Sequence, residues 1–555
     1  MAAARDKSLP PVPRAHSMGR NQRRHTSSLI SSGLYAIDEI SWPMPPGMSL
    51  PPLSPSAPEE TPTYLVDKMS RLHVFTYVAT ICMALLCTQI GIGQTLATLR
   101  EIGASFDITN TSDLTWNLAG YTLAIGTFIL LAGRLGDAYG YKRVFLIGFV
   151  WSAVWSAISG ISVYSTHSLF TVSRVLHGVG AALSLPNGFA LLGSTHPPGP
   201  QKALAFTLVA AMAPIGLVVG ALSAGLLALA WWPLAYWAFA LMLLIIAGAG
   251  YFAIPQVIQK NAMPATMRDA VLELDIPGAV AGISSWELIC FAWNKTSQVG
   301  WKEPYIWLAL ISGALFATLF VLVERYHAPK PLVPFHALSS DTYLALLVGA
   351  CGWSCFGIWI AYTWQFAENI RHASPLLTTA YVTPCIVIGV LATGSSGFLL
   401  QHLRPSIVML LSLLAFTLGS VLIATMPRVQ TYWAQLFLSV LVMSWAVDTS
   451  FPAITLALSH SIERQHQGIA ASLASTVFYY SFSLGLGVAR TVESYVNRGD
   501  QSTRGKLRGY RAALYTAVGL AGLGLLICVA ILLKAQFRRR AGCRNCRGNQ
   551  GKQEI

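Results

Sequence analysis

Long apolar segments recur along most of the chain, and short polar segments separate them. A helix rises about 1.5 Å per residue, so roughly 20 apolar residues in helical form cross a hydrocarbon core about 30 Å thick. The polar segments between them need water, which places them at the two membrane surfaces. The pattern predicts fourteen membrane helices, at about 72–97, 114–133, 143–164, 168–193, 202–228, 231–254, 275–294, 305–323, 342–366, 376–400, 405–425, 430–456, 468–490 and 511–533.

The composition agrees with this pattern. Of the 555 residues, 54% are hydrophobic and 11% are charged, whereas globular proteins average about 25% charged residues. The sequence therefore indicates an all-α polytopic membrane protein. Residues 1–70 are different, because they are rich in Pro, Ser and Arg and lack an apolar core. This composition predicts a disordered cytoplasmic tail. We expect no cleavable signal peptide.

The basic residues predict the orientation of the chain. An even number of crossings places both termini on one side, and most of the 37 Lys and Arg residues lie in the tails and loops of that side. Because basic residues accumulate in cytoplasmic loops, both termini are predicted to be cytoplasmic. The same sorting explains the net charge of +14 without a nucleic-acid partner. The sequons at Asn110 and Asn294 fall in predicted exterior loops, where we expect glycosylation.

The segment between the second and third predicted helices, 133–143, is short, charged and rich in glycine. Its order, G-x-L-x-D-x-x-G-x-K-R, resembles the loop between helices 2 and 3 of the major facilitator superfamily of secondary transporters. Ala138 and Tyr141 stand where that family usually has basic residues. The resemblance implies that the aspartate contacts the positive N-terminal end of a helix in the opposite half and so latches one conformation. The residues implied in this latch are Gly133, Asp137, Gly140, Lys142 and Arg143.

The helix count adds to this resemblance. Six helices on each side of a central segment resemble the two halves of the major facilitator fold, with the substrate site near the midplane between them. The two extra helices resemble the fourteen-helix drug:proton antiporter family, as do the DIPG sequence at 275–278 and the PLVP sequence at 331–334. The QTL sequence at 94–96, in place of that family's aspartate and asparagine, is similar to the fungal aminotriazole-resistance and boron-efflux branch. The implied organisation is the tail at 1–70, a six-helix bundle at 71–254, a linker with two extra membrane helices at 255–341, a six-helix bundle at 342–533 and a basic cytoplasmic tail at 534–555.

Arg174 is the most informative single residue, because a cation near the bilayer interior costs several kcal/mol unless it faces a wet cavity or a partner. Arg174, His177 and Gly178 lie on one helix face. Their segment resembles the family's helix-4 motif R-x-x-Q-G-x-G-A-A, whose arginine is implicated in proton transfer. His177 replaces the glutamine, and its ordinary pKa near 6.5 lies in the working range. Both residues are candidates for proton coupling, with ordinary packing as the alternative.

Asp448 lies in the twelfth predicted helix, close to Pro452. An unpaired carboxylate there is unfavourable, so we expect it to face a cavity or to be neutral at resting pH. It is the third proton-coupling candidate, and the alternative is a carboxyl that caps the chain at a break near Pro452. Glu287 is also within a predicted helix, but it belongs to the extra pair, so we expect it to have a structural partner.

The fifth predicted helix carries Gly216, Gly220 and Gly225, whose spacing allows a neighbouring helix to approach closely. The segment resembles the antiporter motif G-x-x-x-G-P-x-x-G-G, which the family associates with export. Ala221 and Ala224 replace its proline and one of its glycines, and plain packing of small residues is the alternative.

Aromatic rings in the predicted helices are candidates for stacking on a planar or cationic substrate. Packing or interfacial anchoring is the alternative for each of them. The candidates are Trp116, Tyr121, Trp359, Tyr362, Tyr479 and Tyr480.

Other chemistry has little support in the sequence. Most of the nine cysteines lie in apolar segments, where Cys acts as a small hydrophobe, so no disulfide framework is expected. No Walker loop and no intramembrane HExxH or G-x-S-x-G motif is present, so we expect neither an enzyme nor an ATP-driven pump. We also expect no cofactor and no metal.

These features lead to one hypothesis and two rivals. The hypothesis is a monomeric transporter that exports a small molecule, such as a drug, toxin or secondary metabolite, in exchange for protons by alternating access. We expect it in the plasma membrane, with the vacuolar membrane as the alternative. The first rival is an importer or uniporter of a small nutrient, ammonium or a siderophore. The second is a non-transporting sensor on a transporter scaffold, whose function deletion of residues 1–60 would abolish.

Overall fold

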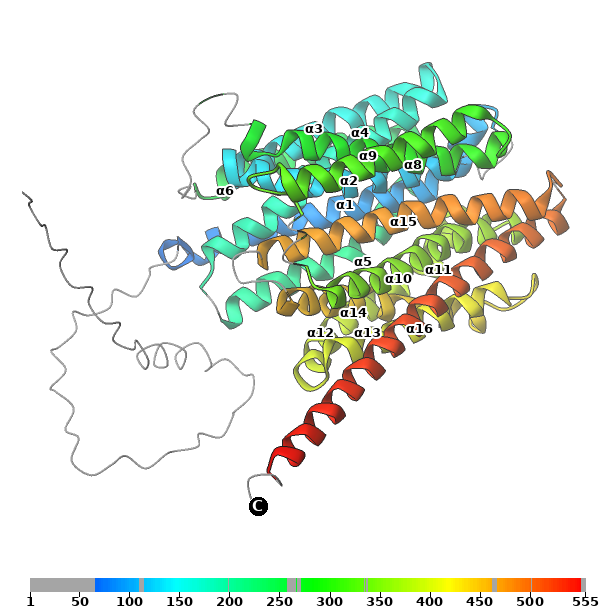
Figure 1. Cartoon of the computed structure of the whole chain (residues 1–555). Helices are drawn as coiled ribbons and strands as arrows, with labels where there is room; N and C mark the ends of the chain where they lie inside the picture. The colour runs from blue at the N-terminus through cyan, green and yellow to red at the C-terminus, as the bar shows by residue number, and fades with distance from the viewer. Residues whose placement is uncertain are drawn as a thin grey trace, which may run out of the picture. The chain divides into compact units, whose positions relative to one another are not determined.

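The computed structural model describes residues 65–108, 114–197, 199–256, 266, 271–333, 335, 338–461, 467–500 and 502–550. Every regular element within these residues is a helix, and fourteen helices are long and apolar enough to cross a membrane (Figure 1). The predicted all-α membrane fold with fourteen spans is confirmed. Most of the predicted N-terminal tail lies outside the described residues, which begin with a short 3-10 helix at Leu65–Lys68.

The first six membrane helices pack closely on one another. Helix α1 lies along α5, α2 lies against α4, and α3 packs between α4 and α6. Their bounds are α1 Arg71–Ser105, α2 Thr115–Tyr139, α3 Tyr141–Ile161, α4 His167–Thr195, α5 Pro200–Ala228 and α6 Pro233–Ala253.

The last six spans form a second group. Helix α10 packs against α15 and α16, and α13 packs against α14 and α16. One span is divided into α11 and α12 at Pro384, and α10 ends in a π-helical turn, Phe366–Ile370. The bounds are α10 Ser340–Gln365, α11 Pro375–Val382, α12 Pro384–His402, α13 Pro405–Ala424, α14 Gln435–Ser461, α15 Gln467–Asn497 and α16 Thr503–Gln550.

The two extra helices form a hairpin over one of the two seams between these groups. The seams run along α2 and α15 on one side, and along α5 with α11 and α12 on the other. Helix α8 (Ile276–Val299) contacts both α2 and α15, and α9 (Pro304–Tyr326) lies beside α8 (Figure 1). The hairpin therefore covers the α2–α15 seam.

Two glycines with positive φ identify the two ends of the spans. Gly140 has a φ of 102° and is the single residue between α2 and α3, while Gly300 has a φ of 82° and follows α8. Glycine adopts this backbone region without steric cost. We call the two ends of the helices the Gly140 end and the Gly300 end.

Several helices continue past the predicted ranges. Helix α1 runs to Ser105 rather than 97, α15 to Asn497 rather than 490, and α16 to Gln550, where the sequence predicted a tail. Hydropathy marks the part of a helix that crosses lipid, whereas backbone hydrogen bonds continue into polar sequence. Lys and Arg are also good helix formers.

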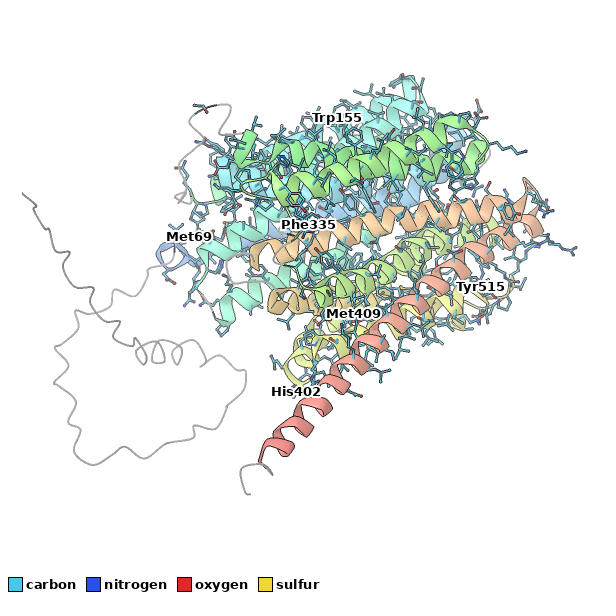
Figure 2. All side chains as sticks on the ribbon, viewed as in Figure 1. Met69, Trp155, Phe335, His402, Met409 and Tyr515 are labelled. Atoms are coloured by element: carbon cyan, nitrogen blue, oxygen red, sulfur yellow. The ribbon has the colours of Figure 1, made fainter. Side chains whose placement is uncertain are left out.

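Side chains fill the space between the helices. Buried apolar side chains, among them Met409, form a core that extends through both groups (Figure 2). Large apolar side chains also point outward, and Phe252 and Leu308 are 82% and 66% exposed. Exposed apolar surface of this kind is expected where lipid surrounds the helices.

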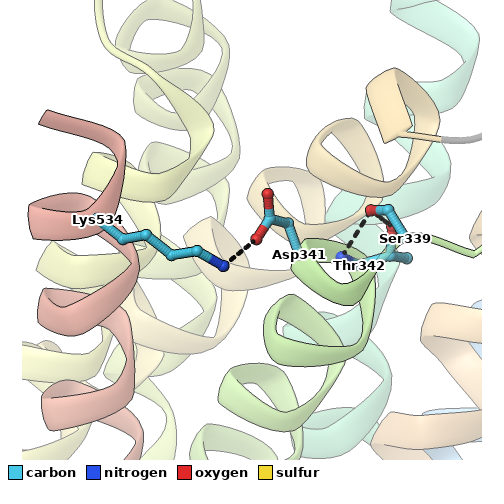
Figure 3. Close-up of polar contacts among 4 residues, drawn as sticks. All are labelled: Ser339, Asp341, Thr342 and Lys534. Carbon is cyan, nitrogen blue, oxygen red and sulfur yellow. Dashed lines mark hydrogen bonds and ion pairs between the residues drawn. The ribbon is translucent and has the colours of Figure 1, made fainter. Parts of the chain in front are cut away.

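The Gly140 end also carries a surface ion pair between α16 and α10. Lys534 Nζ lies 3.3 Å from Asp341 Oδ1, beside the Ser339 cap that accepts a hydrogen bond from the Thr342 N–H (Figure 3). Both charged side chains are about half exposed. Such a pair contributes at most about 1 kcal/mol.

Candidate functional site

A cavity of about 770 Å³ lies between the two groups of helices. Helices α1, α4 and α5 line one side of it, and α10, α12, α14 and α15 line the other. It extends toward the Gly140 end, since its walls include Phe189 near the end of α4 and Phe206 near the start of α5. Toward the Gly300 end the space is filled, because Leu99, Ile102 and Trp364 are buried. The cavity thus extends toward the Gly140 end and is closed toward the Gly300 end.

Asp448 lines this central cavity at the point where the two groups touch. A Cβ atom built on Gly389 of α12 would lie 2.7 Å from Asp448 Oδ2 and 2.5 Å from Cγ of Pro214, which belongs to α5. Among the described residues, no basic side chain pairs with Asp448. Helix α14 continues through Pro452 to Ser461. The alternative of a carboxyl that caps a chain break there is therefore wrong.

Aromatic side chains form part of the same cavity wall. The rings of Trp353 and Phe478 stack with centroids 4.6 Å apart and planes 4° apart, and Phe356 stacks on Trp359 at 6.2 Å. All four rings and Tyr479 line the cavity. Of the six aromatic candidates, Trp359 and Tyr479 are the two in the cavity wall. Flat aromatic surfaces beside a carboxyl can hold a planar or cationic ligand.

Two other aromatic candidates lie elsewhere. Trp116 is in the first turn of α2, close to the Gly300 end, and is partly buried. The ring of Tyr480 lies 4.5 Å from the ring of Trp286 on α8, and both line a second cavity of about 680 Å³ under the hairpin. Glu287 lies beside Tyr480 and beside Thr127 of α2. Its neighbours are thus on the covered seam, away from the central cavity.

Arg174 lies inside the first group of helices and is fully buried. Its Nη2 donates to the carbonyl of Gly91 and to the hydroxyl of Thr95, both at 2.7 Å, and its Nη1 lies 2.9 Å from Nδ1 of His177. The guanidinium also lies 4.5 Å from the ring centroid of Tyr121. Hydrogen bonds and a cation–π contact therefore replace the water that this charge loses.

The Arg174 cluster is separate from the cavity that contains Asp448. His177 is buried between the rings of Tyr121 and Phe239, and Tyr121 donates to the Thr88 carbonyl at 2.9 Å. None of the residues in this cluster lines the central cavity. The structure thus brings together Arg174, His177 and Tyr121, but it does not bring Arg174 to Asp448.

The glycines of α5 allow two helices to approach closely. A Cβ on Gly216 would collide with the carbonyl of Leu86, and one on Gly220 would lie 2.5 Å from the carbonyl oxygen of Ile90. Both carbonyls belong to α1. Gly225 instead faces α11. The first two glycines therefore serve the α1–α5 contact, and the third lies at the uncovered seam.

Tyr141 and Lys142 of the charged segment at 133–143 make contacts within the first half. The Tyr141 hydroxyl donates to Asp137 Oδ1 at 2.7 Å, and Lys142 Nζ donates to the Ile254 carbonyl at the end of α6 at 2.5 Å. Gly140 provides the turn. The helix of the opposite half that packs along α2 is α15, and the side chains of its first turn lie outside the described residues. The implied latch to the opposite half therefore stays a prediction.

Arg143 of this segment is exposed. Two of its glycines, Gly133 and Gly136, differ in their surroundings. Gly133 has open space on its side-chain face. Gly136, which sequence reasoning did not single out, lies against Asn187 of α4, and a Cβ there would collide with the amide oxygen. The Asn187 amide donates to the Ala132 carbonyl at 3.0 Å. Gly136 is therefore the glycine of this motif that a close helix contact requires.

Sequence reasoning also missed a buried charged group in the second half. Arg490 and Glu493 are 2% and 4% exposed, and the Tyr362 hydroxyl donates to Glu493 Oε2 at 2.7 Å. Tyr510 lies beside Tyr362 and accepts from the Asn369 amide at 2.9 Å. Tyr362 is thus a helix-packing residue rather than part of the cavity wall. The sequence did contain an indication that the helix extends further, because the apolar face of α15 continues past residue 490.

The two sequons do not both lie in loops. Asn110 is outside the described residues. The second sequon lies in the last turns of α8, where Thr296 is 3% exposed and its hydroxyl donates to the Ala292 carbonyl at 2.7 Å. The predicted loop position of Asn294 is therefore wrong, since α8 continues to Val299.

A scan against family models matches residues 79–486 to the Major Facilitator Superfamily. The chain is 48% identical to the low affinity ammonium transporter of Saccharomyces cerevisiae, over 82% of this chain and 88% of that protein. It is 39% identical to efflux pump terJ of Aspergillus terreus, over 84% and 90% of the two chains. It is 33% identical to the aminotriazole resistance protein of S. cerevisiae, over 84% and 85%. These matches agree with the resemblance seen in the motifs.

Solved structures agree on the fold. The crystal structure of peptide transporter POT in complex with sulfate superposes with a TM-score of 0.59 and covers 83% of this chain and 94% of that one. The sequence identity is 13%, so this likeness concerns the arrangement of helices alone.

Proposed function

Because the chain belongs to the Major Facilitator Superfamily, a family of small-molecule transporters and not of enzymes, we propose that it is a proton-coupled exporter that works by alternating access. Its substrate is a small molecule with a planar or cationic part. The protein acts as a monomer in the plasma membrane with both termini in the cytoplasm. The Gly140 end is then the cytoplasmic end, and the structure corresponds to an inward-facing state.

The observation that carries this proposal is the position of Asp448. Its carboxyl has no charged partner among the described residues, and it lies in the cavity wall at the contact between Pro214 of one half and Gly389 of the other. A charged carboxylate without a partner is costly in the membrane, so proton binding or a cationic substrate changes its free energy strongly. Because the carboxyl lies at the seam, that change can differ between the two conformations. A ligand or proton shifts the equilibrium between two conformations only to the extent that its binding free energy differs between them.

The names of relatives favour export. Efflux pump terJ and efflux pump terG are 39% and 35% identical to this chain, and each covers more than four fifths of it. The glycines of α5 agree with the export motif of the family in part, and two of them, Gly216 and Gly220, hold α5 against α1 beside the cavity.

The test uses membrane vesicles with an imposed pH gradient and a substrate identified by comparing metabolites in cells with and without the protein. We expect substrate flux to follow the pH gradient in the wild type, and Asp448→Asn to lose this dependence. Asp341→Asn is the matched control, because it removes the same charge from the exposed pair with Lys534, outside the cavity. Wild-type substrate flux that does not depend on the pH gradient would refute proton coupling. Full pH-driven flux in Asp448→Asn would remove Asp448 from the proton role.

A second candidate function is uptake of ammonium, favoured by the 48% identity to a relative named a low affinity ammonium transporter. In this case Asp448 and the rings of Trp359 and Tyr479 attract a small cation. Uptake of labelled methylammonium into cells distinguishes the two. Expression of an importer raises the internal label, whereas expression of an exporter lowers the internal level of its substrate.

A further inference from the structure

Three parts of the chain meet at the Gly140 end, near the base of the hairpin. Arg134 near the end of α2 donates from Nη2 to the Pro331 carbonyl at 2.6 Å. The Val333 N–H, two residues later, donates to Glu324 Oε2 near the end of α9 at 3.3 Å. The segment after α9 is therefore held by α2 on one side and by α9 on the other.

Asp275 begins the other helix of the hairpin. Its backbone has a φ of 47° and a ψ of 54°, and its Oδ1 accepts from the Gly278 N–H at 3.2 Å. A Cβ on Gly278 would collide with the Asp275 carboxyl, so glycine leaves the space that the carboxyl occupies. The cap uses one carboxyl oxygen and leaves the other free.

The free oxygens of the two acids are buried together. Asp275 and Glu324 are each 3% exposed, and their side chains are neighbours at the base of the hairpin, where α8 begins and α9 ends. Asp275 Oδ2 and Glu324 Oε1 have no hydrogen-bond donor among the described residues. Two ionised carboxylates so close together repel strongly, whereas a single proton between them gives a strong hydrogen bond.

The surrounding charges agree with one shared proton. Arg134 is the described basic residue that faces Glu324, and its positive charge compensates one carboxylate. Glu273 is nearby but is paired with Lys330 at 2.9 Å, and both are more exposed. With one proton, the group formed by the two acids and Arg134 is neutral. Without it, the group has an uncompensated buried negative charge, which is costly.

We propose that Asp275 and Glu324 form a one-proton binding site, and that the bound proton holds the 331–333 segment against α2 and α9. The site is distinct from the central cavity, and it links the hairpin to the α2–α3 segment. Leu332 and Val333 also form part of the wall of the second cavity, next to Ala279 and Phe320. Loss of the proton therefore loosens the wall of this cavity at the Gly140 end.

Hydrogen exchange of the full-length protein in lipid nanodiscs tests this site at the Val333 amide. In the wild type, protection of Val333, corrected for the intrinsic exchange rate, falls as pH rises through the range in which the shared proton is lost, by about tenfold per pH unit for one linked proton. Glu324→Gln keeps the Val333 contact, and its amide N–H replaces the proton, so protection stays high at all pH values. Glu273→Gln is the control, and it keeps the wild-type dependence.

Asp275→Asn provides a second variant, because its amide can cap α8 and donate to Glu324. It is expected to behave as Glu324→Gln does. Protection in the wild type that does not depend on pH would overturn the proposal, as would loss of the pH dependence in Glu273→Gln. Recovery of protection at high pH on addition of a divalent cation would assign the two oxygens to a metal instead of a proton. Asp448→Asn leaves the Val333 profile unchanged, which separates this site from transport coupling.

Discussion

Gly389 on α12 gives a direct test of the contact between the two halves. Its side-chain position is enclosed by Pro214 of α5 and by the carboxyl of Asp448. The Asp448 side chain can rotate away from a new methyl group, but the Pro214 ring is fixed within α5. Gly389→Ala therefore forces the α5–α12 seam to open slightly, and the cost falls on the conformation seen here.

The cost follows from the contact distances. A Cβ atom 2.5 Å from Pro214 Cγ is about 1 Å inside the optimal carbon–carbon separation. Inserting one carbon into such packing typically costs about 1–3 kcal/mol. If the seam is wider in the opposite conformation, this energy shifts the ratio of the two conformations by about 5- to 150-fold. Transport slows as well, because the cycle requires both conformations.

The shift is measurable as cavity accessibility. Ser444 lines the central cavity, so Ser444→Cys reports reaction with an impermeant maleimide added at the Gly140 side, in a background that lacks the cavity thiol Cys385 and the tail thiols Cys543 and Cys546. We expect Gly389→Ala to slow this reaction strongly. Gly394→Ala is the matched control on the same helix, since no atom lies within 4 Å of its Cβ position.

Two outcomes would refute this reasoning. Equal labelling rates in Gly389→Ala and Gly394→Ala would show that the seam absorbs a methyl group without cost. Faster labelling in Gly389→Ala would show that the contact is tighter in the opposite conformation than in this one.

Two further predictions concern the first half. Gly136→Ala destabilises the purified protein by about 1–3 kcal/mol, because its methyl group meets the Asn187 amide. Gly133→Ala is the control and changes the melting temperature little, because the side-chain face of Gly133 is open space. Equal effects of the two changes would contradict the α2–α4 contact. Arg174→Lys loses the planar fork that reaches two acceptors of α1, and we expect a loss of about 2 kcal/mol. In a double-mutant cycle with Thr95→Val the two losses are less than additive, and simple additivity would show that the hydrogen bond contributes nothing.

The fold was largely predictable because a bilayer imposes a minimum helix length on apolar sequence. All fourteen spans follow from this rule, and Gly140 was found in the turn between α2 and α3. The ends of the helices were less predictable, because a helix does not stop where its apolar part stops. The thirteenth predicted helix therefore stopped at residue 490, although α15 continues to Asn497 and Glu493 is buried in it.

The candidate site was predictable where a residue is costly in lipid. Asp448 was identified for this reason, and so was Arg174. Sequence could not show that they lie apart, because the face that a helix turns to the cavity depends on neighbours distant in the chain. Gly389 gave no signal, since a glycine in an apolar segment is common and its closeness to Pro214 depends on the seam.

The hairpin makes the two seams physically different. Glu287 of α8 lies beside Thr127 of α2 and beside Tyr480 of α15, so the hairpin contacts both halves at the covered seam. At its base, Arg134 of α2 holds the segment that follows α9. Any movement of α15 relative to α2 must therefore strain or break a hairpin contact. The α5–α12 seam has no such cover among the described residues, and it carries Asp448. In the proposed alternating-access cycle the hairpin therefore has to give up its contacts with one half, either those of α8 with α15 or that of Arg134 with Pro331.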